Sequence, residues 1–213
     1  MAELWYPVLI TVLTGYMLGN LNGAVLVSAI FANEDVRKHG SGNAGLTNYI
    51  RNYGASTGLL VILIDGAKAV MACLVGKLIF DNIDPMLGGT IGGLGVMLGH
   101  TFPAMLAFKG GKGILSGFCL AMTMDWRIGL MILAFFLVFY LSTQYVSLGS
   151  VMGATGFAIA FPIFYHDNLP VAIMGFFMGA LAVFMHRGNI VRLVKGQERK
   201  TNLFAKGNKG KQK

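Results

Sequence analysis

The chain has few charged residues and almost no cysteine. Only 12% of its 213 residues are charged, and its two cysteines, Cys73 and Cys119, lie inside apolar stretches without a C-x-x-C pair or a neighbouring histidine. This pattern supports neither a disulfide framework nor a metal site, so we expect no bound metal and no cofactor. Hydrophobic residues make up 55% of the chain, which is typical of a membrane protein and unusual for a soluble domain.

Acidic residues are also scarce, since nine Asp and Glu face 17 Lys and Arg, for a formal charge of +8. Basic residues concentrate in residues 187–213, and most of the others lie in short loops between apolar runs. The chain therefore lacks the long basic face that would indicate a nucleic-acid partner. We expect the basic tail to adhere to an anionic membrane surface, and we see no sign of an obligate protein partner.

Long stretches without charge divide the chain into candidate membrane helices. A helix needs roughly 20 residues to cross the hydrocarbon, so the interval 128–166 must hold two crossings, with a turn near Ser142–Tyr145. The interval 113–124 is short enough to be re-entrant instead. The apolar intervals are 4–33, about 57–80, 85–108, 113–124, 128–166 and 168–186.

The positive-inside rule decides whether the short interval crosses. The segment 32–56 and the tail after residue 186 are both basic, so both should be cytoplasmic. This holds if 113–124 crosses the membrane. We predict an all-α integral membrane protein with seven transmembrane helices, the amino terminus outside and the carboxyl terminus cytoplasmic. Residues 1–194 form one membrane domain, and residues 195–213 form a basic, disordered tail.

Many of the 30 glycines lie four residues apart inside the predicted helices. Small residues at this spacing let helix backbones approach closely. The run around Gly88–Gly95 follows no predicted strand, so we favour helix packing over nucleotide binding there. The pairs and triplets are Gly15, Gly19 and Gly23; Gly88 and Gly92; Gly89 and Gly93; Gly95 and Gly99; Gly149 and Gly153; Gly175 and Gly179.

Two glycine-rich loops interrupt the apolar pattern. The first, residues 41–48, combines glycines with hydroxyl and amide side chains and is followed by Arg51; the second, residues 109–113, reads Lys-Gly-Gly-Lys-Gly. Glycines let backbone N–H groups converge on a phosphate, and the cations add charge. The second loop has no Ser or Thr after Lys112, so it is not a P-loop. The alternatives are a flexible turn for the first loop and a topology anchor for the second.

Ionisable residues also lie within the apolar runs. Asp65 and Lys68, three residues apart on one helix, either satisfy each other or mark a functional site. His100 and His186 each end an apolar run near the cytoplasmic boundary, where an interfacial histidine commonly caps a helix.

Four sequence blocks span nearly the whole chain in a fixed order and spacing. They are Ser41-Gly42-Asn43-x-Gly45-x-Thr47-Asn48-x-x-Arg51, Gly99-His100-x-x-Pro103 leading into Phe108–Gly113, Tyr145-Val146-Ser147-Leu148-x-Ser150, and His186-Arg187-x-Asn189-Ile190-x-Arg192-Leu193-x-x-Gly196-x-Glu198. Together these blocks resemble the bacterial glycerol-3-phosphate acyltransferases called PlsY. At residues 19–22 the chain departs from that family's pattern, reading Gly-Asn-Leu-Asn where the family carries a Gly-Ser-Ile-Pro-like stretch.

The resemblance implies transfer of a fatty acyl group from acyl phosphate to the 1-hydroxyl of glycerol 3-phosphate. The products would be lysophosphatidate and phosphate, in the first step of phospholipid synthesis at the bacterial inner membrane. The active site would face the cytoplasm. By the same resemblance, the catalytic residues are Ser41, Arg51, Lys112, His186 and Asn189, and the substrate-binding residues are Gly42, Asn43, Thr47, Ser147, Ser150 and Arg192.

A general base is harder to assign. Other acyltransferase families place an aspartate five positions after a histidine, but here Met105 follows His100 and Val191 follows His186 at that distance. We therefore favour substrate-assisted catalysis, in which a phosphate dianion takes the proton, with His186 as the competing base. The alternative function is an organic-phosphate transporter, although no pair of broken helices in matching halves is evident.

Overall fold

The computed structural model describes residues 4–201, and every regular element in that range is helical. Two short 3-10 turns, η1 (Val36–Lys38) and η2 (Ala104–Leu106), lie in the loops. The helices are α1 (Trp5–Asn20), α2 (Gly23–Ala32), α3 (Leu46–Tyr53), α4 (Ala55–Ile79), α5 (Pro85–Thr101), α6 (Ile114–Met124), α7 (Trp126–Thr143), α8 (Val146–Phe164), α9 (Leu169–Met185) and α10 (Arg187–Val194).

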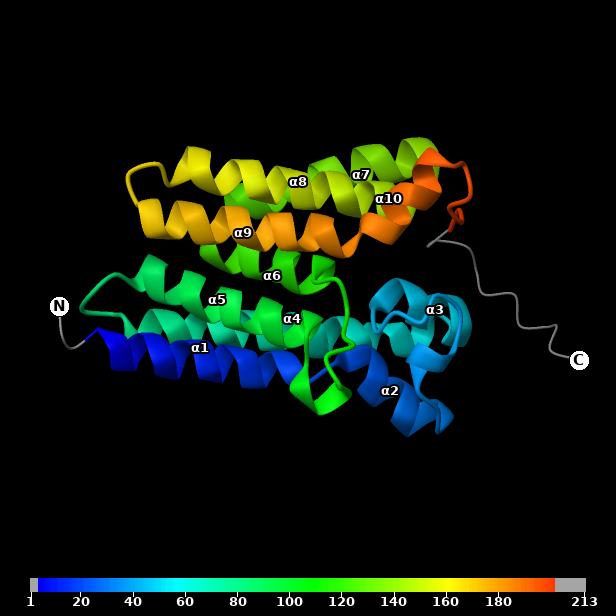
Figure 1. The fold of residues 1–213 in the computed structure, drawn as a ribbon, viewed down its shortest axis with the longest axis horizontal. Coiled ribbons are helices and arrows are strands. Elements are labelled where there is room, and N and C mark those ends of the chain that lie inside the picture. Colours follow the sequence, from blue (N-terminus) through cyan, green and yellow to red (C-terminus); the bar gives the residue numbers. More distant parts are fainter. Residues whose placement is uncertain (1–3, 202–213) are drawn as a thin grey trace, which may run out of the picture.

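The long helices form one bundle whose consecutive members run antiparallel. Helices α1, α4 and α5 pack on one side, α7, α8 and α9 on the other, and α6 lies between the two groups (Figure 1). Because each connection turns the chain back, α2, α3, α10 and both glycine-rich loops gather at one end of the bundle. The described start of the chain lies at the opposite end.

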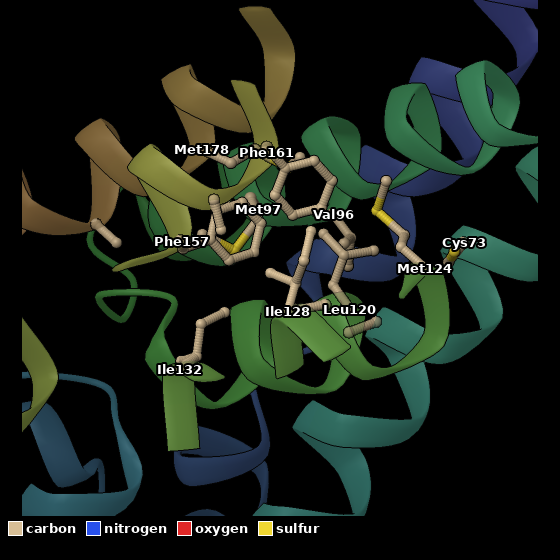
Figure 2. Packing of buried hydrophobic residues seen from close by; sticks show 14 of the residues in the cluster. Cys73, Val96, Met97, Leu120, Met124, Ile128, Ile132, Phe157, Phe161 and Met178 are labelled. Carbon is tan, nitrogen blue, oxygen red and sulfur yellow. The ribbon is translucent and has the colours of Figure 1, made fainter. Parts of the chain in front are cut away.

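The core lies where α6 meets α5, α8 and α9. Val96, Met97, Leu120 and Phe161 are at most 1% exposed, and Figure 2 shows Phe157 beside Phe161 in this cluster, with their rings stacked 4.7 Å apart. In a membrane, lipid is as apolar as these side chains, so close packing holds the helices together. Large apolar residues on the bundle exterior suit contact with lipid tails.

Four helical stretches are long and apolar enough to cross a membrane: Trp5–Ala32, α4, α7 and α8. A fifth results if α9 and α10, which meet at a bend of 53°, are taken as one broken span. Helix α6 is apolar but has only 11 residues. The expectation of an all-α, multi-pass membrane protein is confirmed for the described residues, and each predicted apolar interval contains a helix of the bundle.

The predicted turn within 128–166 is also confirmed. Helix α7 ends at Thr143, Gln144 adopts a left-handed conformation with φ of 63°, and α8 begins at Val146. A left-handed residue after the last helical turn is a common way to end a helix.

Glycine spacing does serve helix packing. A Cβ atom built on Gly19 would lie 2.7 Å from the Cα of Gly99, and one on Gly95 would lie 2.7 Å from the carbonyl oxygen of Val12. Any side chain at these positions would force α1 and α5 apart. The preference for packing over nucleotide binding is therefore supported by the contacts of these glycines.

At the end opposite the glycine-rich loops, acidic residues cap helices. Asp84 accepts hydrogen bonds from Met86 N and Leu87 N at the start of α5, at 2.9 and 3.1 Å. Asp125 accepts from Arg127 N at the start of α7, at 3.0 Å, and also pairs with the Arg127 side chain. Carboxylates at these positions accept hydrogen bonds from otherwise free N–H groups and interact favourably with the positive end of the helix dipole.

Candidate functional site

Asn48 organises the first glycine-rich loop. Its side chain is buried at the start of α3, and its amide donates to the backbone carbonyls of Val36, His39 and Asn43 at 3.0–3.1 Å. Its Oδ1 accepts from Ser41 N at 2.9 Å. One side chain therefore gathers the loop around itself and sets the position of Ser41.

Glycine is needed within this loop because Gly42 has φ of 71°, a conformation that side chains disfavour. Arg37 of η1, just before this loop, contacts the connection between α5 and α6: its Nη1 donates to the carbonyls of Leu106 and Lys109 at 2.8 and 3.3 Å. Asp35 pairs with Arg37 at 2.8 Å, and the hydrogen bonds from the guanidinium lower the pKa of the Asp35 carboxyl group.

The second loop connects α5 to α6. Gly111 N donates to His100 O at 3.0 Å and Gly110 N donates to Thr101 O at 3.2 Å, so the loop folds back along the end of α5. Gly113 has φ of 79° and directly precedes α6. Lys112 therefore sits at the start of a helix, where the N–H dipoles add to its attraction for anions.

The junction of α9 and α10 faces these loops. His186 lies at the bend, and its Nδ1 lies 2.7 Å from Ala182 O. The next turn carries Asn189, whose Oδ1 accepts a hydrogen bond from Lys112 Nζ. The bend thus brings the carboxyl-terminal block of the chain into contact with the second glycine-rich loop.

Helix α8 contributes two serines from its first turns. Ser147 and Ser150 are both buried, at 7% and 5% exposure. The Ser147 hydroxyl has no hydrogen-bond partner within residues 4–201. A buried hydroxyl without a partner is costly, so it is available to a ligand that enters the site.

Two neighbouring cavities occupy this end of the bundle. The larger measures about 440 Å³ and extends from the polar loops into the core, where Met97, Phe157 and Met178 line it. The smaller measures about 320 Å³, and its lining includes Arg187. All of the predicted site residues line one cavity or both: Ser41, Gly42, Asn43, Thr47, Arg51, Lys112, Ser147, Ser150, His186, Asn189 and Arg192.

Positive charge exceeds negative charge around the cavities. Arg51, Lys112 and Arg192 line the larger cavity together with two carboxylates, Asp65 and Glu198, and Glu198 accepts from Arg192 Nε at 2.9 Å. Burial lowers the pKa of Lys112 to about 8, and the neighbouring Arg192 acts in the same direction. Burial also lowers the pKa of the Arg51 guanidinium. An anion would relieve this crowding of cations. No group of three potential metal ligands occurs in the part of the chain that the structure describes.

Residues 195–201 pass beside the site instead of extending away from it. Buried Glu198 accepts from Asn189 Nδ2 at 3.2 Å. Thr201 N donates to Gln144 O at 3.0 Å, and Tyr140 donates to Thr201 O at 3.1 Å. We expected a disordered tail from residue 195, but these contacts place its first residues against α7 and α10. Residues 202–213 of the predicted tail lie outside the described part of the chain.

Arg51 is engaged by this same segment. Its guanidinium donates to the Thr201 hydroxyl, with the Nε contact at 2.9 Å, and to the Arg199 carbonyl at 3.3 Å. Both acceptors are neutral, so Arg51 keeps its charge for an incoming anion.

Asn48 and Glu198 were quoted in the sequence blocks but not chosen as site residues. Asn48 acts through backbone carbonyls that no side-chain pattern reveals. The one available signal for Glu198 was its isolation as the single acidic residue in an otherwise basic tail.

Comparison with known proteins agrees with this geometry. The family model described as glycerol-3-phosphate acyltransferase matches residues 9–196. A glycerol-3-phosphate acyltransferase of Thermoanaerobacter sp. (strain X514) is 38% identical over 195 residues, covering 92% of this chain and 96% of that protein. One of Clostridioides difficile (strain 630) is 37% identical over 197 residues, with the same coverage of 92% and 96%.

Solved structures of PlsY (YgiH), an integral membrane glycerol 3-phosphate acyltransferase, are also similar. The glycerol 3-phosphate form superposes with a TM-score of 0.81 and is 29% identical, covering 92% of this chain and 96% of that one. The lysophosphatidic acid form gives a TM-score of 0.79 at 28% identity, with the same coverage of 92% and 96%. With its fold, its cationic cavities and these matches in agreement, the chain belongs to the glycerol-3-phosphate acyltransferase family of the PlsY type.

Proposed function

We propose that this acyltransferase takes its acyl group from acyl phosphate. The 1-hydroxyl of glycerol 3-phosphate attacks the acyl carbonyl carbon, the bond to the phosphate oxygen breaks, and lysophosphatidate and phosphate are released. The single observation that carries this proposal is a cationic polar mouth that opens into an apolar cavity among the helices. Such a cavity suits a donor with an anionic head and a long hydrocarbon chain. The similar structures of PlsY in glycerol 3-phosphate and lysophosphatidic acid forms support the acceptor and the product.

The two cavities suggest where each substrate binds. The larger cavity has the apolar interior for the acyl chain, and the smaller one is lined by Arg187 and Arg192 and suits the phosphate of glycerol 3-phosphate. Lys112 and Asn189 line both cavities and are hydrogen bonded to each other. In this proposal both residues contact the two phosphates at once, and the charge of Lys112 offsets the repulsion between the phosphates.

The remaining residues surround these contacts. Ser41 and Arg51 would bind phosphate oxygens, and Ser147 and Ser150 would orient the glycerol hydroxyls. Backbone N–H groups of the two glycine-rich loops would stabilise the oxyanion that forms on the acyl carbon. Gly42, Asn43 and Thr47 would complete the first loop around the phosphate.

For the proton, we favour a phosphate dianion of the substrate as the acceptor. A phosphate monoester has a second pKa of roughly 6, so the dianion is present at neutral pH. His186 is the competing base. If its Nδ1 carries the ring hydrogen and donates it to Ala182 O, then Nε2 is unprotonated and can accept the proton of the hydroxyl. If His186→Gln abolishes turnover while glycerol 3-phosphate still binds to a folded protein, the histidine is the base.

We also propose seven crossings, with the amino terminus outside and the site at the cytoplasmic face of the bacterial inner membrane. The alternating helix directions support this, since they gather Arg37, Arg51 and Lys112 at one end and Asp84 and Asp125 at the other. Single cysteines at either end, labelled by an impermeant maleimide in intact cells, test it. Labelling of the basic end from outside the cell would show that the orientation is the opposite of the one proposed.

Phosphate release from a long-chain acyl phosphate, with and without glycerol 3-phosphate, tests the activity. Acceptor-dependent release by the purified protein, together with formation of lysophosphatidate, is the expected result. Flux of glycerol 3-phosphate into sealed liposomes without an acyl donor, in the absence of any transfer, would instead show an organic-phosphate transporter.

A further inference from the structure

A buried ionic cluster lies beneath the two glycine-rich loops. Asp65 and Lys68 of α4 and His100 of α5 are 2%, 3% and 4% exposed. Lys68 Nζ lies 2.7 Å from Asp65 Oδ1 and 2.9 Å from His100 Nδ1. Charges buried in a membrane helix bundle are costly unless they are fully paired. The three-residue spacing of Asp65 and Lys68 left open whether the pair only satisfies itself.

The cluster reaches further than that pair, because it also holds the break between α1 and α2. Lys68 Nζ donates to Leu21 O at 2.5 Å and lies 3.3 Å from Gly19 O. Asp65 Oδ1 accepts from Gly23 N at 3.1 Å, at the first residue of α2. Backbone groups left free by a helix break need such partners. The ion pair thus fixes residues 19–22, the stretch between α1 and the start of α2.

That break in turn holds the first glycine-rich loop. Asn22 donates through Nδ2 to Ala44 O at 3.0 Å, and its Oδ1 accepts from Val25 N at 3.0 Å. Asn22 and Ala44 are 1% and 0% exposed, so this contact is shielded from water. The position of Ala44 therefore depends on the break that Lys68 and Asp65 stabilise.

His100 supports the second loop. Since an ammonium can only donate, Nδ1 of His100 accepts from Lys68, and the ring hydrogen resides on Nε2. A Cβ atom on Gly111 would overlap Nε2, and it would lie 2.9 Å from Ala44 O. The imidazole edge and the first loop are thus both packed against the backbone of Gly111, next to Lys112.

We propose that Asp65, Lys68 and His100 are positioning residues that hold the two anion-binding loops in register. The cluster sets the separation between the Ser41 side and the Lys112 side of the site, where both phosphates would bind. This inference rests on the proposed function, because it concerns the same site. Misplacement of catalytic groups by about 1 Å can cost on the order of 100-fold in rate, so we expect the cluster to affect turnover beyond its effect on folding.

Lys68→Met tests the inference, because it keeps chain length and removes the charge. Lys77→Met is the matched control on the same helix: Lys77 donates to Thr123 O at 3.0 Å, near the opposite end of the bundle. We expect kcat/KM for glycerol 3-phosphate to fall at least about tenfold in Lys68→Met and to stay at the wild-type level in Lys77→Met. The kcat/KM values of both variants are measured at a temperature below that at which either variant unfolds. Equal losses in the two variants would overturn the inference.

A double variant separates positioning from stability. Asp65→Asn with Lys68→Met removes both buried charges, so the unfolding temperature should recover toward the wild-type value while kcat/KM stays low. Recovery of kcat/KM together with the unfolding temperature would show that the pair only stabilises the fold, and would overturn the inference.

A readout independent of activity follows the loops directly. Nitroxides at two exposed positions, Lys38 just before the first loop and Lys109 in the second, in a Cys73→Ala and Cys119→Ala background, report the distance between the two loop regions. We expect this distance to shift or broaden in Lys68→Met and not in Lys77→Met. Unchanged distances in both would contradict the inference even if the wild type is active. If the loops move in Lys68→Met but the wild-type protein releases no phosphate, the proposed function is contradicted and the inference about the cluster stands.

Discussion

The two ends of the helix bundle handle charge in opposite ways. At the end away from the glycine-rich loops, each capping carboxylate is satisfied by nearby partners: Asp84 accepts from Asn168 Nδ2 at 2.7 Å as well as from its own helix, and Asp125 accepts from Tyr165 at 3.2 Å and pairs with Arg127 at 2.6 Å. At the other end, Arg51 and Lys112 contact neutral acceptors. These two carboxylates therefore support structure, whereas the charges of Arg51 and Lys112 remain available for a ligand.

The sharpest way to test this difference is to remove a cation from the site end. Lys112→Ala should lower kcat/KM for glycerol 3-phosphate by about 100-fold or more, because it deletes a charge that contacts both proposed phosphate positions. Steady-state phosphate release measures the effect. Lys109→Ala, an exposed lysine of the same loop, serves as the control and should lose much less. Equal losses would mean that loop charge in general, and not Lys112, matters.

The pH profile tests whether Lys112 must be protonated. Its lowered pKa of about 8 means that charge is present below pH 8 and is lost as the pH rises through that value. We expect kcat/KM, which reports the free enzyme, to fall about tenfold per pH unit well above pH 8. Lys112→Arg should move this limb to higher pH, since a guanidinium stays charged. A limb that stays in place in Lys112→Arg would assign it to another group.

The opposite end should respond in stability alone. Asp125→Ala removes the cap of α7 and should lower the free energy of unfolding by about 1 kcal/mol, seen as a lower unfolding temperature in detergent. The value of kcat/KM should not change. Asp125→Asn, which can still cap the helix, should lose less. A loss of activity in Asp125→Ala without a loss of stability would show that the two ends are coupled.

The smallest effect concerns the segment beside the site. Thr201→Val removes the hydroxyl that Arg51 contacts, so Arg51 no longer gives up that bond when it binds a phosphate. One hydrogen bond of this kind is worth about 1 kcal/mol. Because water can partly replace the lost bond in the free enzyme of the variant, we expect KM to decrease by only about threefold. An increase in KM would show instead that Thr201 holds Arg51 in its productive position.

The sequence predicted the helices and the site residues better than it predicted the segment after α10. The apolar intervals each contain a helix, the turn at Gln144 falls where its polar neighbours predicted, and the predicted site residues all line the two cavities. By contrast, the segment through Thr201 was expected to be disordered, because its composition is polar and basic. Its order comes from backbone contacts to Gln144 and from buried Glu198, which composition does not report.

Local spacing, hydropathy and residue type specify the helical membrane class, the glycine spacing that lets helix backbones approach closely, and the chemical character of the site. Tertiary contacts, by contrast, determine that the glycines of α1 meet α5, that Lys68 reaches His100 and the α1–α2 break, that Asn48 gathers the first loop, and that Glu198 closes one side of the site. The contacts of Lys68 join segments 32 and 47 residues apart, and those of Asn48 and Glu198 depend on the path of a turn. Their distances depend on how helices pack, and no local pattern encodes that.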